Sequence, residues 1–101
     1  MHSRLELQSL LEAILGSRNV YFTPPASIKM SYPAIVYELD NIENGHADGG
    51  PYIQNFRYAV TVIDKNPDSE FISKISKLPT CSYERSFKSD NLNHTVFSLY
   101  Y

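Results

Sequence analysis

The sequence predicts an α+β fold, a mostly antiparallel sheet with two helices packed on one face. Three observations predict this class. Two segments carry apolar residues at helical spacing, five short segments are rich in β-branched and aromatic residues, and most of these are separated only by turn formers. Because strands joined by turns pair antiparallel, the two helices are left to cover one face of the sheet. The expected order is α-β-β-β-α-β-β.

Residues 4 to 15 are the first expected helix. Ser3 and Glu6 match a capping box, in which the serine oxygen accepts from an early helix amide and the glutamate reaches back to the cap. Gly16 follows the last turn, where a left-handed helix end favours a residue without a side chain. The apolar stripe of this helix recurs at i, i+3, i+4 and i+7: Leu7, Leu10, Leu11 and Ile14.

Two strands are expected next. Residues 19 to 22 form a short edge strand that Pro24 and Pro25 stop, since proline cannot donate a ladder hydrogen bond. Residues 34 to 39 form the second strand, and Pro33 is tolerated because it precedes the strand.

Residues 41 to 52, "NIENGHADGGPY", are expected to form a long mobile loop. Asn-Gly, Gly-Gly and proline lie within a dozen residues, and this density of turn formers is typical of loops. We expect none of this segment to pack in the core.

Residues 56 to 63, "FRYAVTVI", are expected to be a central strand. Alternate residues point to opposite faces of a strand, so one face of this segment is wholly apolar and the other is mixed. The apolar face comprises Phe56, Tyr58, Val60 and Val62.

A second helix is expected to follow, with Asn66 as its N-cap and Pro67 at its first position. Asp68 would place negative charge near the positive end of the helix dipole, and Pro79 would end the element. Its apolar stripe is Phe71, Ile72, Ile75 and Leu78.

The last two strands, 81 to 87 and 94 to 101, are expected to form a hairpin with the polar break at residues 88 to 93.

The stretch "VTVIDKNPDSEF", residues 60 to 71, raises the question of a metal or phosphate site. A calcium loop needs oxygen ligands at alternate positions, a glycine and a terminal glutamate, and a phosphate loop needs glycines with a lysine. Neither pattern is present, whereas the capping roles of Asn66, Pro67 and Asp68 account for the polar residues. The favoured interpretation is a structural corner between a strand and a helix.

Other chemistry has little support. His46, Asp48 and His94 are residue types that suit zinc or manganese, but they lie in a glycine-rich segment and a distant strand. No histidine and carboxylate lie beside Cys81, Ser82 or Ser86 in a pattern that would activate a nucleophile. We therefore expect no catalytic residue, no metal and no cofactor.

Charge is distributed unevenly along the chain. No lysine or arginine lies between Lys29 and Arg57, while four carboxylates do. Two interpretations stay open: a solvated loop, or an acidic arm that reaches a partner or repels negatively charged molecules. The four acidic residues are Glu38, Asp40, Glu43 and Asp48.

Four phrases of the sequence resemble the small tail-completion proteins of long-tailed bacteriophages. This group includes tail terminators and tail-to-head joining proteins, often labelled minor capsid or minor tail proteins in prophages. The resemblance covers about the whole chain and is strongest from Tyr32 to Tyr100. The phrases are "YPAIVYELD", "YAVTVIDKNPDSEF", "LPTCSYERSF" and "DNLNHTVFSLYY".

The resemblance implies a structural virion protein without enzymatic activity. Such subunits assemble as a ring, typically a hexamer, at the head-proximal end of the tail, where the ring stops growth of the tail tube and meets the head connector. The implied partners are further copies of the chain, the major tail protein and the head-tail connector proteins. DNA would pass through the ring without specific binding, and the implied location is the virion, with the host cytoplasm during assembly.

The resemblance and the acidic segment together place the expected interface on the segment from Asn41 to Tyr52, whose carboxylates would face the DNA channel. The sequence does not separate a terminator from a joining protein. The competing hypothesis is a small soluble cytoplasmic protein-binding module that acts as a monomer or dimer through exposed tyrosines. The expected interface residues are Glu43, Asn44, His46, Asp48 and Tyr52.

Overall fold

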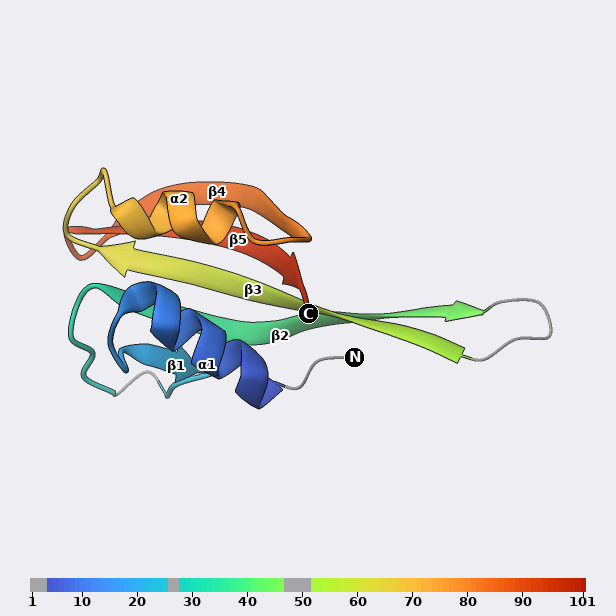
Figure 1. Cartoon of the computed structure of the whole chain (residues 1–101). Coiled ribbons are helices and arrows are strands. Elements are labelled where there is room, and N and C mark those ends of the chain that lie inside the picture. The colour runs from blue at the N-terminus through green and yellow to red at the C-terminus, as the bar shows by residue number, and fades with distance from the viewer. Residues whose placement is uncertain (1–3, 26–27, 47–51) are drawn as a thin grey trace.

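A computed structural model describes residues 4–25, 28–46 and 52–101, with the backbone alone at residues 44–46 and 52–54 (Figure 1). The chain is an α+β domain with the element order that the sequence predicts. The elements are α1 (Arg4–Leu15), β1 (Val20–Phe22), β2 (Ala34–His46), β3 (Tyr52–Asp64), α2 (Glu70–Ser76), β4 (Cys81–Ser89) and β5 (Leu92–Tyr100).

The five strands form one sheet in the order β1-β2-β3-β5-β4. Only β1 and β2 pair in parallel, and the three other pairs are antiparallel. The predicted central position of β3 is confirmed, since β3 is the third of the five strands.

Both helices pack on the same face of the sheet, as predicted. Figure 1 shows α1 over β1 and β2, and α2 over the side formed by β5 and β4. Burying each large apolar side chain contributes roughly 1.5 to 3 kcal/mol, so this shared cluster is what attaches the helices. The core cluster consists of Leu7, Leu11, Leu15, Val20, Ile35, Tyr37, Tyr58, Val60, Val62, Ile75, Phe97 and Leu99.

Helix α1 spans the residues predicted for it. Gly16 has a φ of 76°, the left-handed conformation expected after the helix, and its N–H donates to Glu12 O at 2.9 Å. The hydroxyl of buried Tyr37 donates to Gln8 Oε1 at 2.5 Å, which ties β2 to the helix. The predicted cap residue, Ser3, lies outside the described residues.

The second helix is shorter than predicted and begins later. Its N-cap is Ser69, not Asn66, and α2 ends at Ser76, before Leu78 and Pro79. The side chain of Asn66 instead accepts a hydrogen bond from the N–H of Asp68 at 3.0 Å. This local bond stabilises a turn in place of the expected first helical turn.

The C-terminal hairpin is confirmed, and its turn is tighter than the predicted polar break. Strand β4 pairs with β5 up to Ser89 and Leu92, so only Asp90 and Asn91 remain between them. Both have positive φ, 51° and 62°, as a two-residue type I′ turn requires.

The prediction of a loop over residues 41 to 52 is wrong for its described part. Strands β2 and β3 are 13 residues each, and their pairing continues through Ile42↔Phe56 and Asn44↔Gln54 to His46↔Tyr52. Extending an antiparallel pair that is already in register adds ladder hydrogen bonds without closing a new loop, so the Asn-Gly content does not end the strand. Residues 47–51 lie outside the description.

The extended pairing produces an arm, defined as residues 38–46 and 52–56. On β2 the arm begins after Tyr37, the last residue that pairs with β1. On β3 the arm ends just before Arg57, which pairs with Tyr100 of β5. The chain measures 52 Å along its longest axis and 23 Å along the others (Figure 1). Its radius of gyration, 14.7 Å, exceeds the roughly 13 Å of a compact chain of this length.

A matched pair of leucines on α1 tests the core assignment. Leu11→Ala should lower the free energy of unfolding by about 2 to 5 kcal/mol, because Leu11 is fully buried and alanine leaves a cavity. Leu5→Ala should change it by no more than about 0.5 kcal/mol, because Leu5 is 66% exposed. Urea unfolding followed by circular dichroism measures both, and equal effects would contradict the assignment.

Candidate interaction surface

The arm carries exposed apolar side chains on its helix-facing side. In the sheet register, Leu39 lies beside Tyr58 and Ile42 beside Phe56, so this row continues the core outward along the arm. Tyr58 is 5% exposed, whereas Leu39 is 44% and Ile42 41% exposed. A two-stranded ribbon with such a surface gains stability when another surface covers it.

A β-bulge at Asp40 keeps this apolar row in phase. The register shifts between Leu39 and Asn41, so odd-numbered residues face the helices before the shift and even-numbered residues after it. Ile42 therefore lies on the same face as Leu39. Without the bulge, Asn41 would take that place.

Phe22 extends the exposed apolar surface onto β1. Its ring is 37% exposed and lies 5.0 Å from the ring of Tyr37, centroid to centroid. The guanidinium of Arg4 lies 4.5 Å from the same ring. We name Phe22, Leu39 and Ile42 the arm-base patch.

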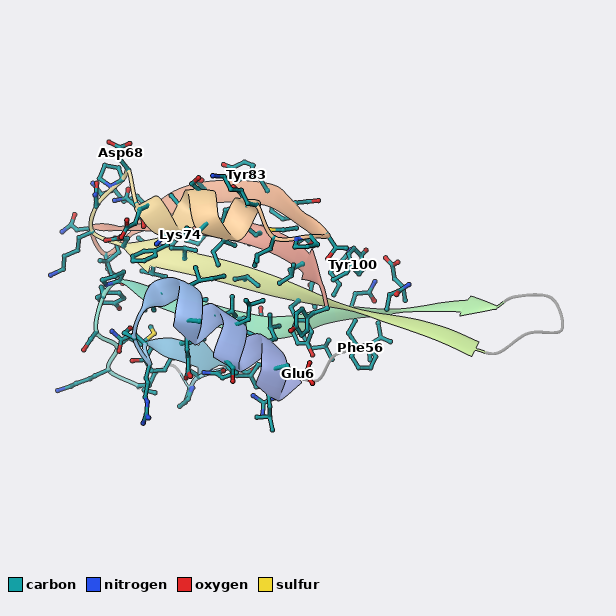
Figure 2. The ribbon with its side chains drawn as sticks, in the orientation of Figure 1. Glu6, Phe56, Asp68, Lys74, Tyr83 and Tyr100 are labelled. Carbon is teal, nitrogen blue, oxygen red and sulfur yellow. The ribbon has the colours of Figure 1, made fainter. Side chains whose placement is uncertain are left out.

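The opposite side of the arm is polar, and four side chains form what we name the brace. Arg57 Nε donates to Asp40 Oδ2 at 2.9 Å. Tyr100 OH donates to Glu43 Oε1 at 2.7 Å. These contacts connect β2, β3 and β5 at the point where the arm leaves the sheet, and Figure 2 shows Tyr100 near that point.

The ionisation of the brace follows from these bonds. The hydrogen bond to Glu43, above all, raises the pKa of Tyr100, because this bond needs the protonated hydroxyl as its donor. The hydrogen bond with Tyr100 is the main cause that raises the pKa of Arg57, with further support from Asp40. The brace therefore fixes the position of two of the arm's carboxylates.

A shallow groove lies away from the arm, between the α2 segment and the β4–β5 hairpin. Its volume of about 270 Å³ is below the roughly 300 to 1,000 Å³ of small-molecule pockets, so it suits a side chain better than a whole ligand. The rings of Phe87 and His94 are stacked at 4.7 Å, and Tyr83 OH and Ser86 Oγ are 2.8 Å apart. The lining residues are Pro67, Ile72, Tyr83, Ser86, Phe87, Asn93, His94 and Thr95.

The structure brings only part of the predicted interface together. Glu43 is exposed on the arm and belongs to the brace. The backbones of Asn44, His46 and Tyr52 lie in the paired strands, so these residues project with the arm and not from a loop. Asp48 lies outside the described residues.

Sequence reasoning missed the rest of this surface. Arg57 and Tyr100 become neighbours of the acidic segment only through the register of three strands. Leu39 and Ile42 carry a signal in the sequence, since apolar residues continue past Tyr37, but the bulge breaks their alternation.

The hypothesised metal and nucleophile sites gain no support. His94 Nδ1 lies 3.1 Å from Leu92 O, and in the described part of the chain no three histidine, cysteine or acidic side chains cluster to hold a metal ion. The side chain of His46, like Asp48, is outside the description. Burial raises the pKa of the Cys81 thiol, which opposes formation of a reactive thiolate.

Within residues 4–25, 28–46 and 52–101, no helix is long and apolar enough to cross a membrane.

The fold and this surface define an α+β domain with a projecting β-ribbon. Neither a protein-family model nor a curated protein sequence matches the chain.

Removing the Tyr100 hydroxyl tests the brace. Tyr100→Phe should accelerate hydrogen exchange at arm amides such as that of Ile42, because Glu43 loses its bond to β5. Exchange in the core, as at Val60, should stay unchanged. Tyr83→Phe is the matched control, since it removes a hydroxyl from β4 far from the arm. Arm exchange that is the same in both variants would contradict the brace.

The brace should also be lost at alkaline pH. A folded-state pKa of Tyr100 above its unfolded value means that the hydrogen bond is present at lower pH and lost as the pH rises through the folded pKa. The 295 nm titration of the protein minus that of Tyr100→Phe should therefore have its midpoint above the ordinary value of about 10. A midpoint at or below that value would contradict this assignment.

Proposed function

We propose that the protein is a non-enzymatic structural component of a long-tailed phage virion. It forms a ring at the head-proximal end of the tail, where the ring terminates the tail tube or joins it to the head connector. The observation that carries the proposal is the arm, a paired ribbon with exposed Leu39 and Ile42 that projects from the packed domain. The resemblance of the quoted sequence phrases to tail-completion proteins supplies the biological setting.

An elongated subunit with an exposed surface on its arm suits repeated contacts around an axis. When the same two unlike surfaces meet in every copy, the contacts close a ring if the rotation between copies permits it. The partners in this proposal are further copies, which form a hexamer on the tail, together with the major tail protein and the connector proteins.

The charge of the arm supports a role beside DNA. Glu38, Asp40 and Glu43 are exposed on it, and among the described side chains Arg57 at its base forms an ion pair with Asp40. An acidic lining repels the phosphate backbone, so DNA would slide through the ring without specific binding. The protein would be in the host cytoplasm during assembly and then in the virion.

Shortening the arm in register tests the proposed function. Asn44 pairs with Gln54, so replacing residues 45–53 with Asn-Gly closes a shorter ribbon with a favourable two-residue turn. The variant should fold, as circular dichroism would verify, yet fail to complete tails. In a phage that carries this variant as its only copy, electron microscopy should show overlong tubes or tails separate from heads.

The control for this experiment is Leu5→Ala, which alters an exposed residue on α1 and should leave phage assembly normal. Normal tails and normal infectivity with the shortened arm would overturn the proposed function.

The groove favours one alternative, a small soluble cytoplasmic protein-binding module that acts as a monomer or dimer. Tyr83 beside the groove is 61% exposed and could anchor a partner. Sedimentation with and without tail-tube protein separates the two functions. Rings that appear with the tube protein support the virion role, and a tight complex with a cellular protein supports the module.

A further inference from the structure

The bulge at Asp40 divides the pairing of β2 with β3 into two parts. Before the bulge Leu39 pairs with Tyr58, and after it Asn41 pairs with Arg57, so Asp40 is left without a partner on β3. A bulge of this kind re-aims the side chains that follow it on the same strand. The side on which the arm presents each residue of β2 from Asn41 onward therefore depends on the bulge.

The same two strands can pair in a second register. If the pairing continues from Leu39↔Tyr58 without a bulge, Asp40 pairs with Arg57, and the rest of β2 moves by one residue. The displaced residue passes into the connection between the strands, which costs little because the entropy of loop closure grows slowly with length. We name the observed pairing the bulged register and the alternative the straight register.

Apolar packing favours the bulged register only weakly. In this register Ile42 lies opposite Phe56 and on the same side as Leu39. The straight register would place Ile42 opposite Asn55, on the polar side of the arm. Ile42 is 41% exposed even in the bulged register, so the difference in burial is small. Residues 43 to 46 read Glu-Asn-Gly-His, and a polar strand with glycine specifies its register poorly.

The hydrogen bond from Tyr100 to Glu43 distinguishes the two registers. Tyr100 pairs with Arg57, and both side chains lie on the polar side of the arm. In the bulged register Glu43 lies on that side as well, and Tyr100 OH donates to its Oε1 at 2.7 Å. In the straight register Glu43 would lie on the helix-facing side, with the ribbon between it and Tyr100. This bond can therefore form only when the bulge is present.

The other bond of the brace does not distinguish the registers. Arg57 Nε donates to Asp40 Oδ2 at 2.9 Å in the bulged register. The straight register would place Asp40 directly opposite Arg57, again on the polar side. The ion pair is compatible with both registers, so the two bonds of the brace differ in their effect although they lie side by side.

We propose that Tyr100 selects the register of the arm. Its hydrogen bond to Glu43 comes from β5, outside the ribbon, and it holds the bulge and with it Ile42 beside Leu39. Without this bond the straight register becomes populated and divides the arm-base patch between the two sides of the ribbon. Tyr100 is thus a positioning residue, through which β5 determines which side chains a partner of the arm meets. The proposal concerns the folded chain alone and does not depend on the virion role.

The nuclear Overhauser effect (NOE) between backbone protons distinguishes the registers in the purified chain. Phe56 O accepts from Tyr101 N–H at 3.0 Å, so this carbonyl points away from β2, and Phe56 belongs to a pair without hydrogen bonds between its members. The same holds for Gln54, two residues away on the strand. The Cα atoms of such pairs are about 4.5 Å apart. A strong Hα–Hα NOE should therefore connect Gln54 to Asn44 in the bulged register and to Glu43 in the straight one.

Exchanging two exposed neighbours makes the selection measurable. In Asn41→Ile/Ile42→Asn the aliphatic side chain faces Phe56 in the straight register, so packing no longer favours the bulge. This exchanged variant should still show the NOE of the bulged register, because Tyr100 remains. Adding Tyr100→Phe should shift the ratio of the registers toward the straight one by about tenfold or more, the effect of one hydrogen bond to a charged acceptor.

Two further variants in the exchanged background are the controls. Asp40→Asn removes the charge of the neighbouring ion pair, and Glu43→Gln keeps an oxygen that accepts from Tyr100, so both should retain the bulged register. Amide shifts in the core, as at Val60, should be the same in all variants. An exchanged variant that is straight with Tyr100 intact, one that stays bulged with Tyr100→Phe, or an equal shift with Asp40→Asn would overturn the proposal.

Discussion

The antiparallel pairing of β2 with β3 is the interaction on which the rest of the structure depends. It runs from Ala34↔Ile63 to His46↔Tyr52 and is the longest pairing in the sheet. Because the side-chain period of a strand is two, a slip of one residue would turn Tyr37 and Val60 away from the helices. The same register that fills the core therefore also sets which side chains the arm presents.

The exposure of the arm follows from a difference in length between helices and strands. Helix α1 has 12 residues and spans about 18 Å, whereas a strand of 13 residues spans about 43 Å. A helix of this length, beginning at Arg4, can cover only part of β2. The bulge at Asp40 then continues the apolar row past the end of that cover, which leaves Leu39 and Ile42 exposed.

The sequence predicts the elements that local patterns specify, and it fails where pairing across strands decides. Apolar spacing correctly predicts α1 with Gly16 after it, the central strand and the hairpin. Turn formers in residues 41 to 46 wrongly indicate a loop, because propensity within a segment contains no information about a partner strand already in register. Asn66 does not cap the helix for a related reason. Its side chain can either cap a helix or stabilise a turn, and here it accepts from the N–H of Asp68 and stabilises a turn. Of the candidate surface, Glu43 could be predicted from charge alone, but Arg57 and Tyr100 could not.

A paired arm changes the energetics of any assembly that uses it. Ordering a mobile loop on binding costs roughly 1 to 2 kcal/mol for each residue whose backbone becomes fixed. In this chain the pairing of β2 with β3 already orders the backbone of the arm when the protein folds. The brace links the base of the arm to β5 and so to the core. The arm is then preorganised, so more of the free energy from covering Leu39 and Ile42 remains available for association.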